Sequence, residues 1–225
     1  MKIAVLGTGM VGRAHAGKLV GLGHDVVIGT KDPAKTMAQD KPDSMGSPPF
    51  SVWHKENSQI KLVSFSDAAK HGEVVFEALH GAAVVEVLSS VKADLAHKIL
   101  IDIANPLDFS KGMPPSLFVS NTDSLGEQVQ KALPETKVVK TFNTMAVTLQ
   151  VNPQMLTNAD HSIFVSGNDA DAKAEVTKIL NSYGWKDVID LGDITTARGT
   201  EMLMPFWLRM WGSLQTPIFN YKIMR

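Results

Sequence analysis

Residues 3–12 read Ile-Ala-Val-Leu-Gly-Thr-Gly-Met-Val-Gly, and this stretch decides the fold. Four apolar residues predict a buried strand, and Gly7, Gly9 and Gly12 follow it at once in the spacing G-x-G-x-x-G. After the turn, Ala16, Leu19 and Val20 share one helical face with Gly12. A strand, a glycine turn and a helix in this order are typical of the phosphate-binding unit of dinucleotide-binding proteins.

Each glycine in this motif has its own physical task. Gly7 allows the tight turn, Gly9 lets the backbone approach a pyrophosphate, and Gly12 permits close packing of helix on strand. The helix that follows presents unpaired N–H groups and the positive end of its dipole to the phosphates. The sequence therefore predicts dinucleotide binding at residues 7–12.

The end of the second predicted strand indicates which dinucleotide is bound. Proteins that bind NAD normally place Asp or Glu there to hold the ribose 2′-hydroxyl, whereas residues 29–31 here are Gly-Thr-Lys. The hydroxyl of Thr30 and the ammonium groups of Lys31 and Lys35 suit a 2′-phosphate, which favours NADP(H). Asp32 could bind ribose instead, but Asp before Pro is typical of a helix N-cap, and we interpret it so.

Short apolar runs alternate with helical patterns along the rest of the chain. This alternation predicts a Rossmann-like α/β fold with a doubly wound, mainly parallel sheet. Strands are expected at Ile3–Leu6, Val26–Ile28, Lys61–Val63, Val74–Phe76, Ile99–Ile103, Lys137–Lys140, Ser162–Val165 and Val188–Leu191. Beyond the helices after the first two strands, further helices are expected near Ala82–Val91, Leu125–Leu133 and Ala170–Tyr183.

Three segments depart from this alternation. Residues 41–58 and 108–122 are rich in Pro and Ser and are predicted to be irregular insertions. Residues 195–225 form an apolar tail whose helix we expect to be broken or kinked at Pro205. We therefore divide the chain into residues 1–194, a nucleotide-binding domain with an acceptor pocket, and residues 195–225, a helical segment that packs on it or on a dimer partner.

Composition excludes several other classes of protein. Lys and Arg number 22 against 23 Asp and Glu, a net charge of −1, so no basic excess favours nucleic acid or an anionic membrane. The absence of cysteine excludes disulfides, zinc–thiolate sites and Cys nucleophiles. No apolar run approaches the roughly 18 residues of a membrane span. We expect a cytoplasmic protein without a metal site.

The sequence offers no arrangement of acid and base residues for reducing a carbonyl group. Tyr183 and Lys186 are one residue too close for a Tyr-x-x-x-Lys pair, and the seven histidines lack metal-ligand spacing. His80 follows the fourth predicted strand and could lie beside a nicotinamide, although a lone histidine there is more often a packed or solvated loop residue. Hydride transfer between two bound heterocycles needs mainly orientation, because the cofactors carry the chemistry. We expect no catalytic acid or base.

Five blocks of the sequence carry a resemblance to a known family. The blocks VLGTGMVGRA, VVIGTKDPAK, LIDIANPLDFSKGMP, VVKTFNTMAV and WKDVIDLGDITTARGTEMLMPFWLRMW occur in this order. The chain resembles the NADP-dependent oxidoreductases of the deazaflavin coenzyme F420 from end to end. The same blocks are similar to the NADPH-binding domain of the six-transmembrane metalloreductases.

The resemblance implies roles for residues at the ends of the strands. Residues 8–11 would cover the pyrophosphate, and the residues after the second strand would hold the 2′-phosphate. Three further segments would border the nicotinamide and complete the pocket in which the deazaflavin ring stacks on it. The implied cofactor-binding residues are Gly7, Thr8, Gly9, Met10, Val11, Gly12, Thr30, Lys31, Lys35, Ala78, Leu79, His80, Ala104, Asn105, Pro106, Asn143, Thr144 and Met145, with Phe142 beside the last three.

The resemblance implies hydride transfer between NADP(H) and F420, a small-molecule redox coenzyme. An NADPH-dependent flavin or ferric-chelate reductase, or a non-catalytic NADP(H) sensor, is an alternative. Met202, Leu203, Trp207 and Trp211 of the tail would form part of the acceptor site or of a homodimer interface. Ordinary core or helix packing is an alternative for Trp207 and Trp211. A homodimer is expected because an exposed helix of this composition is a large apolar patch for a monomer.

Overall fold

A central β-sheet organises the computed structural model, which describes residues 1–43 and 46–225. Eight strands of the described residues follow the order β10-β9-β8-β5-β4-β1-β2-β3. Their bounds are β1 Lys2–Leu6, β2 Asp25–Thr30, β3 Lys61–Ser64, β4 Val74–Glu77, β5 Ile99–Asp102, β8 Lys137–Lys140, β9 Ser162–Gly167 and β10 Asp187–Asp190. All eight predicted strands are present, and their ends agree with the prediction to within two residues.

The sheet is mainly parallel, as the alternation predicted. Only the pair β8·β9 is antiparallel, and β10 runs parallel to β9 at the edge. Strands β1, β4, β5 and β8 lie side by side and point the same way. Their carboxyl ends, and the loops that follow them, therefore meet at one edge of the sheet.

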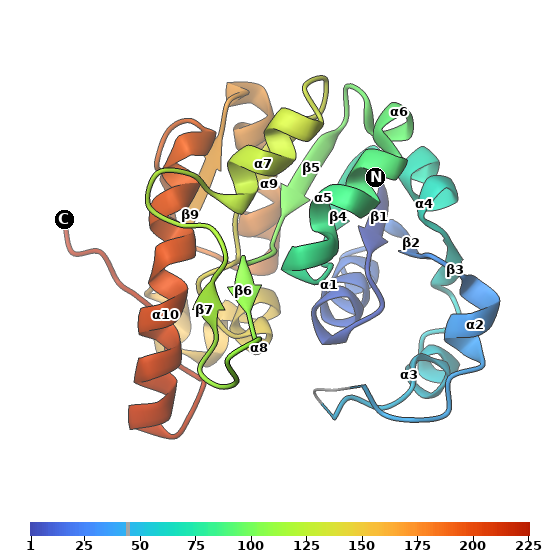
Figure 1. Ribbon diagram of the computed structural model, residues 1–225, viewed down its shortest axis with the longest axis horizontal. Helices are drawn as coiled ribbons and strands as arrows, with labels where there is room; N and C mark the ends of the chain where they lie inside the picture. The colour runs from blue at the N-terminus through green and yellow to red at the C-terminus, as the bar shows by residue number, and fades with distance from the viewer. Residues whose placement is uncertain (44–45) are drawn as a thin grey trace.

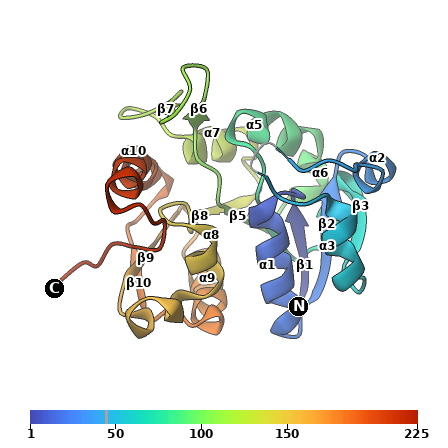
Figure 2. The ribbon, with the colours of Figure 1, turned by 90° about the horizontal axis from the view of Figure 1, so that it is seen from below.

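Helices cover both faces of the sheet, and Figure 2 shows α1 and α9 on one side and α5 and α7 on the other. Helix α10 lies beside the sheet (Figure 1) and contacts α7. The longer helices are α1 Met10–Gly21, α3 Phe50–Glu56, α4 Phe65–His71, α5 Gly81–Ser90, α7 Leu125–Ala132, α9 Ala170–Tyr183 and α10 Ala197–Leu214. The shorter ones are α2 Pro33–Met37, α6 Lys92–Leu95, α8 Val147–Val151, and the 3₁₀ turns η1 Pro153–Met155, η2 Thr157–Ala159 and η3 Ile194–Thr196.

Two hydrophobic clusters fill the space between the sheet and its helix layers. One joins the sheet to α1, α3, α8 and α9, and includes Ile3, Val5 and Leu19. The other joins it to α4, α5, α7 and the start of α10, and includes Leu6 and Leu88. Burial on both faces explains why the central strands are continuously apolar.

The structure corrects three expectations about irregular segments. Residues 44–45 of the predicted insertion 41–58 lie outside the described residues. The rest contains helix α3, in which Phe50 is buried, stacks on His54 and makes a tilted ring contact with Trp53. Segment 108–122 contributes strand β7 (Ser116–Leu117), which pairs with β6 (Leu107–Asp108) as an antiparallel hairpin. We expected α10 to be broken or kinked at Pro205; a break is wrong, since the helix continues through this residue. Met204 and Trp207 are buried before and after Pro205, so the helical turns on both sides of the proline pack against the protein.

No helix in residues 1–43 and 46–225 combines the length and apolar character needed to cross a bilayer.

Candidate dinucleotide site

The turn between β1 and α1 lies at the carboxyl edge of the sheet, between Leu6, which ends β1, and Met10, which begins α1. Gly7 has φ +123°, and its N–H donates to the carbonyl of Gly29 at 3.0 Å. A Cβ on Gly7 would lie 2.4 Å from the carbonyl oxygen of Ala78, and one on Gly12 would lie 2.1 Å from that of Gly7. Gly7 and Gly12 are therefore required by the close packing of the turn itself.

Gly9 differs from the other two glycines because a Cβ there would meet nothing within 4 Å. Its φ of −75° is also ordinary for any residue. Gly9 is exposed and directly precedes helix α1, whose first turn has no acidic residue and whose N-cap makes no side-chain hydrogen bond. An uncapped helix N-terminus beside open space is the arrangement that accommodates a phosphate. The residues present thus fit a dinucleotide pyrophosphate.

The end of β2 confirms our interpretation of Asp32. Its Oδ1 accepts a hydrogen bond from the backbone N–H of Lys35 at 2.9 Å, and Pro33 begins helix α2. The carboxylate is therefore used as a helix cap. Lys31 and Lys35 are exposed at the same turn, while the Thr30 hydroxyl is buried and lies 3.0 Å from that of Thr36.

The loops after β5 and β8 are joined by two side-chain amides. Asn105 Nδ2 donates to the carbonyl of Asn143 at 2.8 Å, and Asn143 Nδ2 donates to Asn105 Oδ1 at 3.0 Å. Helix α5 packs on the same loop so closely that a Cβ on Gly81 would lie 2.1 Å from the Asn105 carbonyl oxygen. Phe142 takes a left-handed conformation, φ +66°, where the chain turns out of β8. The structure thus brings segments 78–81, 104–106 and 142–145 together.

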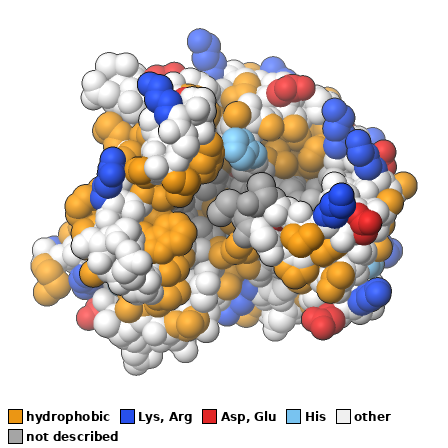
Figure 3. Space-filling model, turned by 60° about the horizontal axis from the view of Figure 1, so that its bottom comes forward, with side chains coloured by type: hydrophobic (Ala, Val, Ile, Leu, Met, Phe, Trp, Pro, Cys, Tyr) orange, Lys and Arg blue, Asp and Glu red, His pale blue; other side chains and the backbone are white. Residues whose placement is uncertain are grey.

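His80 is exposed at the start of α5, with its ring centroid 6.1 Å from that of Phe109. A cavity of about 510 Å³ opens beside it between α5, α7 and the β6–β7 hairpin. Its lining is mostly apolar and includes Val85, Leu107, Phe109 and Phe118. Figure 3 shows a hollow on this side of the molecule, with hydrophobic side chains along its walls.

The third segment lies deeper than the first two. Asn143, Thr144 and Met145 are only 2–4% exposed, so their side chains pack inside the protein instead of lining an open surface. Gln150 of α8 holds them there, because its Nε2 donates to the carbonyls of Phe142 at 3.0 Å and Met145 at 3.1 Å. Their contribution to a bound ring is therefore expected from the backbone and the surrounding support.

Sequence reasoning missed a cluster of buried ionisable side chains below this edge. Glu77, Asp102 and Lys140 end strands β4, β5 and β8, and Glu201 lies on α10; all four are at most 1% exposed. Burial, together with the neighbouring Asp102 carboxylate, raises the pKa of Glu77 well above its usual range. Burial lowers the pKa of Lys140, but the carboxylates of Asp102 and Glu201 outweigh it and raise that pKa. A signal was available: charged residues that end continuously apolar strands.

His15 on α1 also went unnoticed in the sequence. It is fully buried, with Nε2 at 2.9 Å from Gln150 Oε1 and Nδ1 at 3.2 Å from the Tyr183 hydroxyl. Burial lowers the pKa of His15 to about 4, although the hydrogen bond with Gln150 opposes this. A neutral imidazole therefore joins α1 to α8 and α9.

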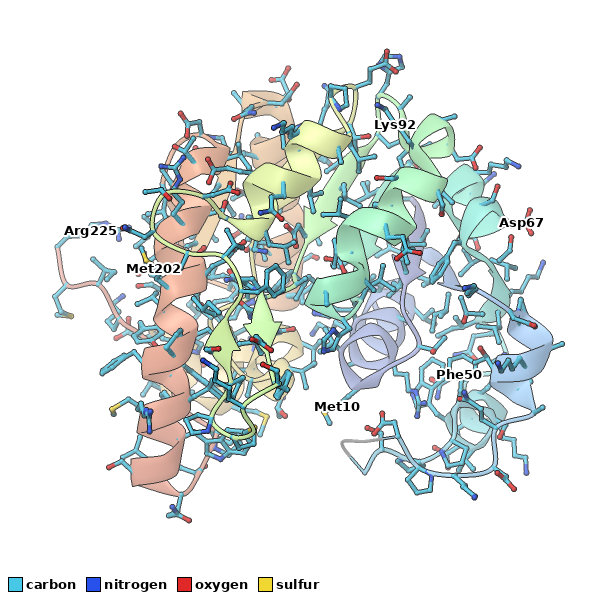
Figure 4. All side chains as sticks on the ribbon, viewed as in Figure 1. Met10, Phe50, Asp67, Lys92, Met202 and Arg225 are labelled. Carbon is cyan, nitrogen blue, oxygen red and sulfur yellow. The ribbon has the colours of Figure 1, made fainter. Side chains whose placement is uncertain are left out.

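The tail residues divide into buried and exposed groups. Trp207 is 6% exposed and its ring lies 5.4 Å from that of Phe219, whereas Met202, Phe206 and Trp211 are 36–54% exposed. Figure 4 shows Met202 on the outer side of α10. Core packing explains Trp207. Phe206 and Trp211 contact the rings of Tyr221 and Trp207 but stay 54% and 36% exposed.

A doubly wound sheet, a glycine turn shaped for a pyrophosphate and two cations after β2 define a dinucleotide-binding protein of the Rossmann class. Comparisons with known proteins agree. The sequence profile of the family "NADP oxidoreductase coenzyme F420-dependent" matches residues 2–106. A crystal structure from Arthrobacter sp. FB24, described as an F420-dependent NADP reductase, is 57% identical, with full coverage of both chains and a TM-score of 0.96.

Two curated relatives are more distant. The F420-dependent NADP reductase of Methanocaldococcus jannaschii is 29% identical, over 91% of this chain and 90% of its own length. The metalloreductase STEAP3 of Rattus norvegicus is 27% identical over 92% of this chain, which spans only 38% of that protein. The chain belongs to the family of coenzyme F420-dependent NADP oxidoreductases.

Proposed function

We propose that the protein transfers a hydride between NADP(H) and the deazaflavin coenzyme F420. The observation that carries this proposal is the full-length similarity to the Arthrobacter protein, at 57% identity and a TM-score of 0.96. The open space at Gly9 and the paired loops after β5 and β8 support it.

The nucleotide is held mainly by backbone and by charge. Residues 7–12 and the N-terminus of α1 bind the pyrophosphate through N–H groups. Thr30, Lys31 and Lys35 bind the 2′-phosphate, and the absence of a carboxylate ligand for the ribose 2′-hydroxyl disfavours NAD(H), because Asp32 is used as a helix cap. Selectivity for NADP(H) thus follows from the turn between β2 and α2.

The bound nicotinamide and deazaflavin rings supply the hydride-donating and hydride-accepting carbons. The protein brings them together: Ala78, Leu79 and His80 border the nicotinamide on one side and residues 104–106 on another. Asn105 and Asn143 join the loops after β5 and β8 by hydrogen bonds, so the backbones of these two loops are preorganised before either ring binds. No acid or base residue is assigned, because the hydride itself moves between two carbons and the proton that completes the reduction of F420 is taken up from water.

The acceptor ring is proposed to lie toward the cavity beside His80. The apolar wall formed by Phe109, Phe118 and Val85 suits a flat heterocycle and excludes water from the reacting carbons. The exposed face of α10 is proposed as the contact with a second copy of the chain. We further propose that the protein acts in the cytoplasm, where its charged, water-soluble coenzymes are found.

A second acceptor class is favoured by one observation. The match to a metalloreductase over 92% of this chain suggests a flavin or ferric chelate in place of F420. The two candidates share the nucleotide site and differ in the acceptor: a flavin takes the hydride as F420 does, whereas a ferric chelate takes single electrons, which a flavin reduced by NADPH would pass on one at a time.

A parallel assay tests the proposal and separates the candidates. NADPH or NADH is mixed with the purified protein and oxidised F420, FMN or a ferric chelate, and the loss of acceptor is followed. We expect loss of the deazaflavin visible absorbance with NADPH, at least about ten times faster than with NADH. Reduction of FMN or ferric chelate without reduction of F420 would replace the first candidate by the second.

A further inference from the structure

Three ionisable residues lie side by side at the ends of three neighbouring central strands. Glu77 of β4 is the register neighbour of Asp102 of β5, which is in turn the neighbour of Lys140 of β8. All three are buried on the same face of the sheet. A sheet does not need them, since apolar residues at such positions are often as stabilising as buried ion pairs. Their presence calls for another explanation.

Glu201 of α10 completes this group. Its Oε1 lies 2.9 Å from Lys140 Nζ, and that ammonium also lies 3.1 Å from both carboxylate oxygens of Asp102. Glu201 accepts backbone hydrogen bonds from Leu125 at 2.8 Å and Gly126 at 3.0 Å, at the start of α7. The ammonium of Lys140 therefore connects two strands, α10 and α7. We call Glu77, Asp102, Lys140 and Glu201 the buried charge cluster.

The other hydrogen bonds of the cluster go to the loops that border the proposed nicotinamide position. Glu77 Oε1 accepts from the N–H of Leu79 at 2.6 Å, and Asp102 Oδ1 accepts from the N–H of Ala104 at 3.0 Å. Lys140 donates to the carbonyl of Ala104. The amide pair of Asn105 and Asn143 extends this support to the loop after β8. The loop after β5 is thus tied to the ammonium of Lys140 directly, and the loop after β8 is tied to it through Asn105. The loop after β4 is linked through Glu77, whose carboxyl group interacts with Asp102.

We propose that Lys140 is a positioning residue, which acts through the buried charge cluster to fix segments 78–80 and 104–106 at the nicotinamide end of the site. The phosphate end depends on other residues, at 7–12 and 30–35, which have no hydrogen bond to the cluster among the described residues. Loss of the cluster should therefore change the position of the nicotinamide ring more than it changes the affinity for NADPH. Displacement of a reacting ring by about 1 Å costs on the order of 100-fold in rate.

The test uses NADPH alone and no acceptor, although the inference rests on the proposed function for the identity of the ring. Reduced nicotinamide fluoresces according to the polarity and rigidity around it. For each protein we measure the dissociation constant for NADPH, and also the emission maximum and lifetime of NADPH in the saturated complex. For Lys140→Met we expect emission shifted toward that of free NADPH, with a dissociation constant raised less than about 5-fold, because the phosphate contacts remain.

Two controls separate positioning from general damage. Lys173→Met makes the same chemical change at the ion pair with Asp190, on edge strand β10, and should leave both quantities unchanged. Lys31→Ala should raise the dissociation constant about 10-fold but leave the saturated emission as in the wild type. If Lys140→Met does not fold, Glu201→Gln removes the link to α10 with little change of shape and is measured in the same way.

The outcomes are distinct. Saturated emission like that of the wild type in a folded Lys140→Met or Glu201→Gln protein would overturn the inference and leave the proposed function intact. A shift in emission and a loss of affinity that both scale with the loss of thermal stability would also overturn the inference, since that pattern marks a structural role only. Failure of the wild-type protein to bind NADPH would instead contradict the proposed function.

Discussion

At the scale of single residues, the three glycines of the turn after β1 should respond differently to substitution. Gly9→Ala places a Cβ in open space at ordinary φ, so we expect a melting temperature within a few degrees of the wild type. Affinity for NADPH should fall about 10-fold or more, because the methyl group occupies the path of the pyrophosphate.

Gly12→Ala is the matched comparison. Its Cβ would lie 2.1 Å from a backbone oxygen, so this variant should lose stability before any ligand is added. Thermal melts with and without NADPH measure both effects. A destabilised Gly9→Ala protein, or one that binds NADPH normally, would contradict the assignment of this space to a phosphate.

Glu77 makes a second prediction at this scale, because its pKa is raised by burial and by Asp102. The folded protein keeps the proton of Glu77 to higher pH than the unfolded chain, which loses it above its ordinary pKa of 4.5. Stability from this group is therefore lost as the pH rises from about 4.5 toward 7. Glu77→Gln cannot ionise, so its free energy of unfolding should match the wild type near pH 4.5 and exceed it at pH 7.

Urea unfolding at the two pH values measures this difference. Asp102→Asn provides the contrast, because it removes a charge that Lys140 contacts. It should lower the free energy of unfolding by about 3 kcal/mol. A Glu77→Gln protein that is less stable than the wild type at pH 7 would show that Glu77 is ionised in the folded state.

At the scale of elements, His15 ties helix α1 to α8 and α9, and this tie should depend on pH. Its pKa is about 4 in the folded protein against 6.5 in an ordinary environment. The unfolded chain therefore binds a proton first, and stability is lost as the pH falls from about 6.5 to about 4. The loss from this group should reach about 3 kcal/mol, from 1.36 kcal/mol per pKa unit.

Unfolding of His15→Gln across this range checks the origin of the loss, with exposed His97→Asn as control. His97 has φ +63°, which Asn tolerates, so the control should keep the full slope of the wild type. His15→Gln should flatten the slope. Equal slopes in all three proteins would mean that another group is responsible.

The elements themselves were largely predictable from the sequence, whereas the support beneath the site was not. All eight strands of the central sheet and the turn at residues 7–12 followed from apolar periodicity and glycine spacing, which are local signals. The sequence did not predict helix α3, because the Pro and Ser residues around it favour an irregular segment. The helix depends on the tertiary packing of Phe50, which no local pattern reveals. The contacts of Lys140 join residues 38 and 61 positions away, Asp102 and Glu201, and no local pattern reveals such pairs.

At the scale of the whole molecule, the exposed face of α10 predicts a homodimer. Phe206 and Leu214 are 54% and 47% exposed, and Trp211 is 36% exposed. Phe206→Asp places a charge on this face and should shift the protein from dimer to monomer in analytical ultracentrifugation. Met224→Asp, on the exposed C-terminal segment, is the control and should stay dimeric. A monomeric wild type at micromolar concentration would rule out this role for α10.

The central claim is that a hydride passes directly from the nicotinamide to the deazaflavin, held by position alone. Isotope transfer tests it most directly: NADPH with deuterium at both C4 positions is incubated with the protein and oxidised F420, and the reduced F420 is analysed by mass spectrometry. Our account predicts one deuterium in each reduced F420, carried at C5, even in ordinary water. Reduced F420 without deuterium, or no reduction while NADPH is bound, would contradict it.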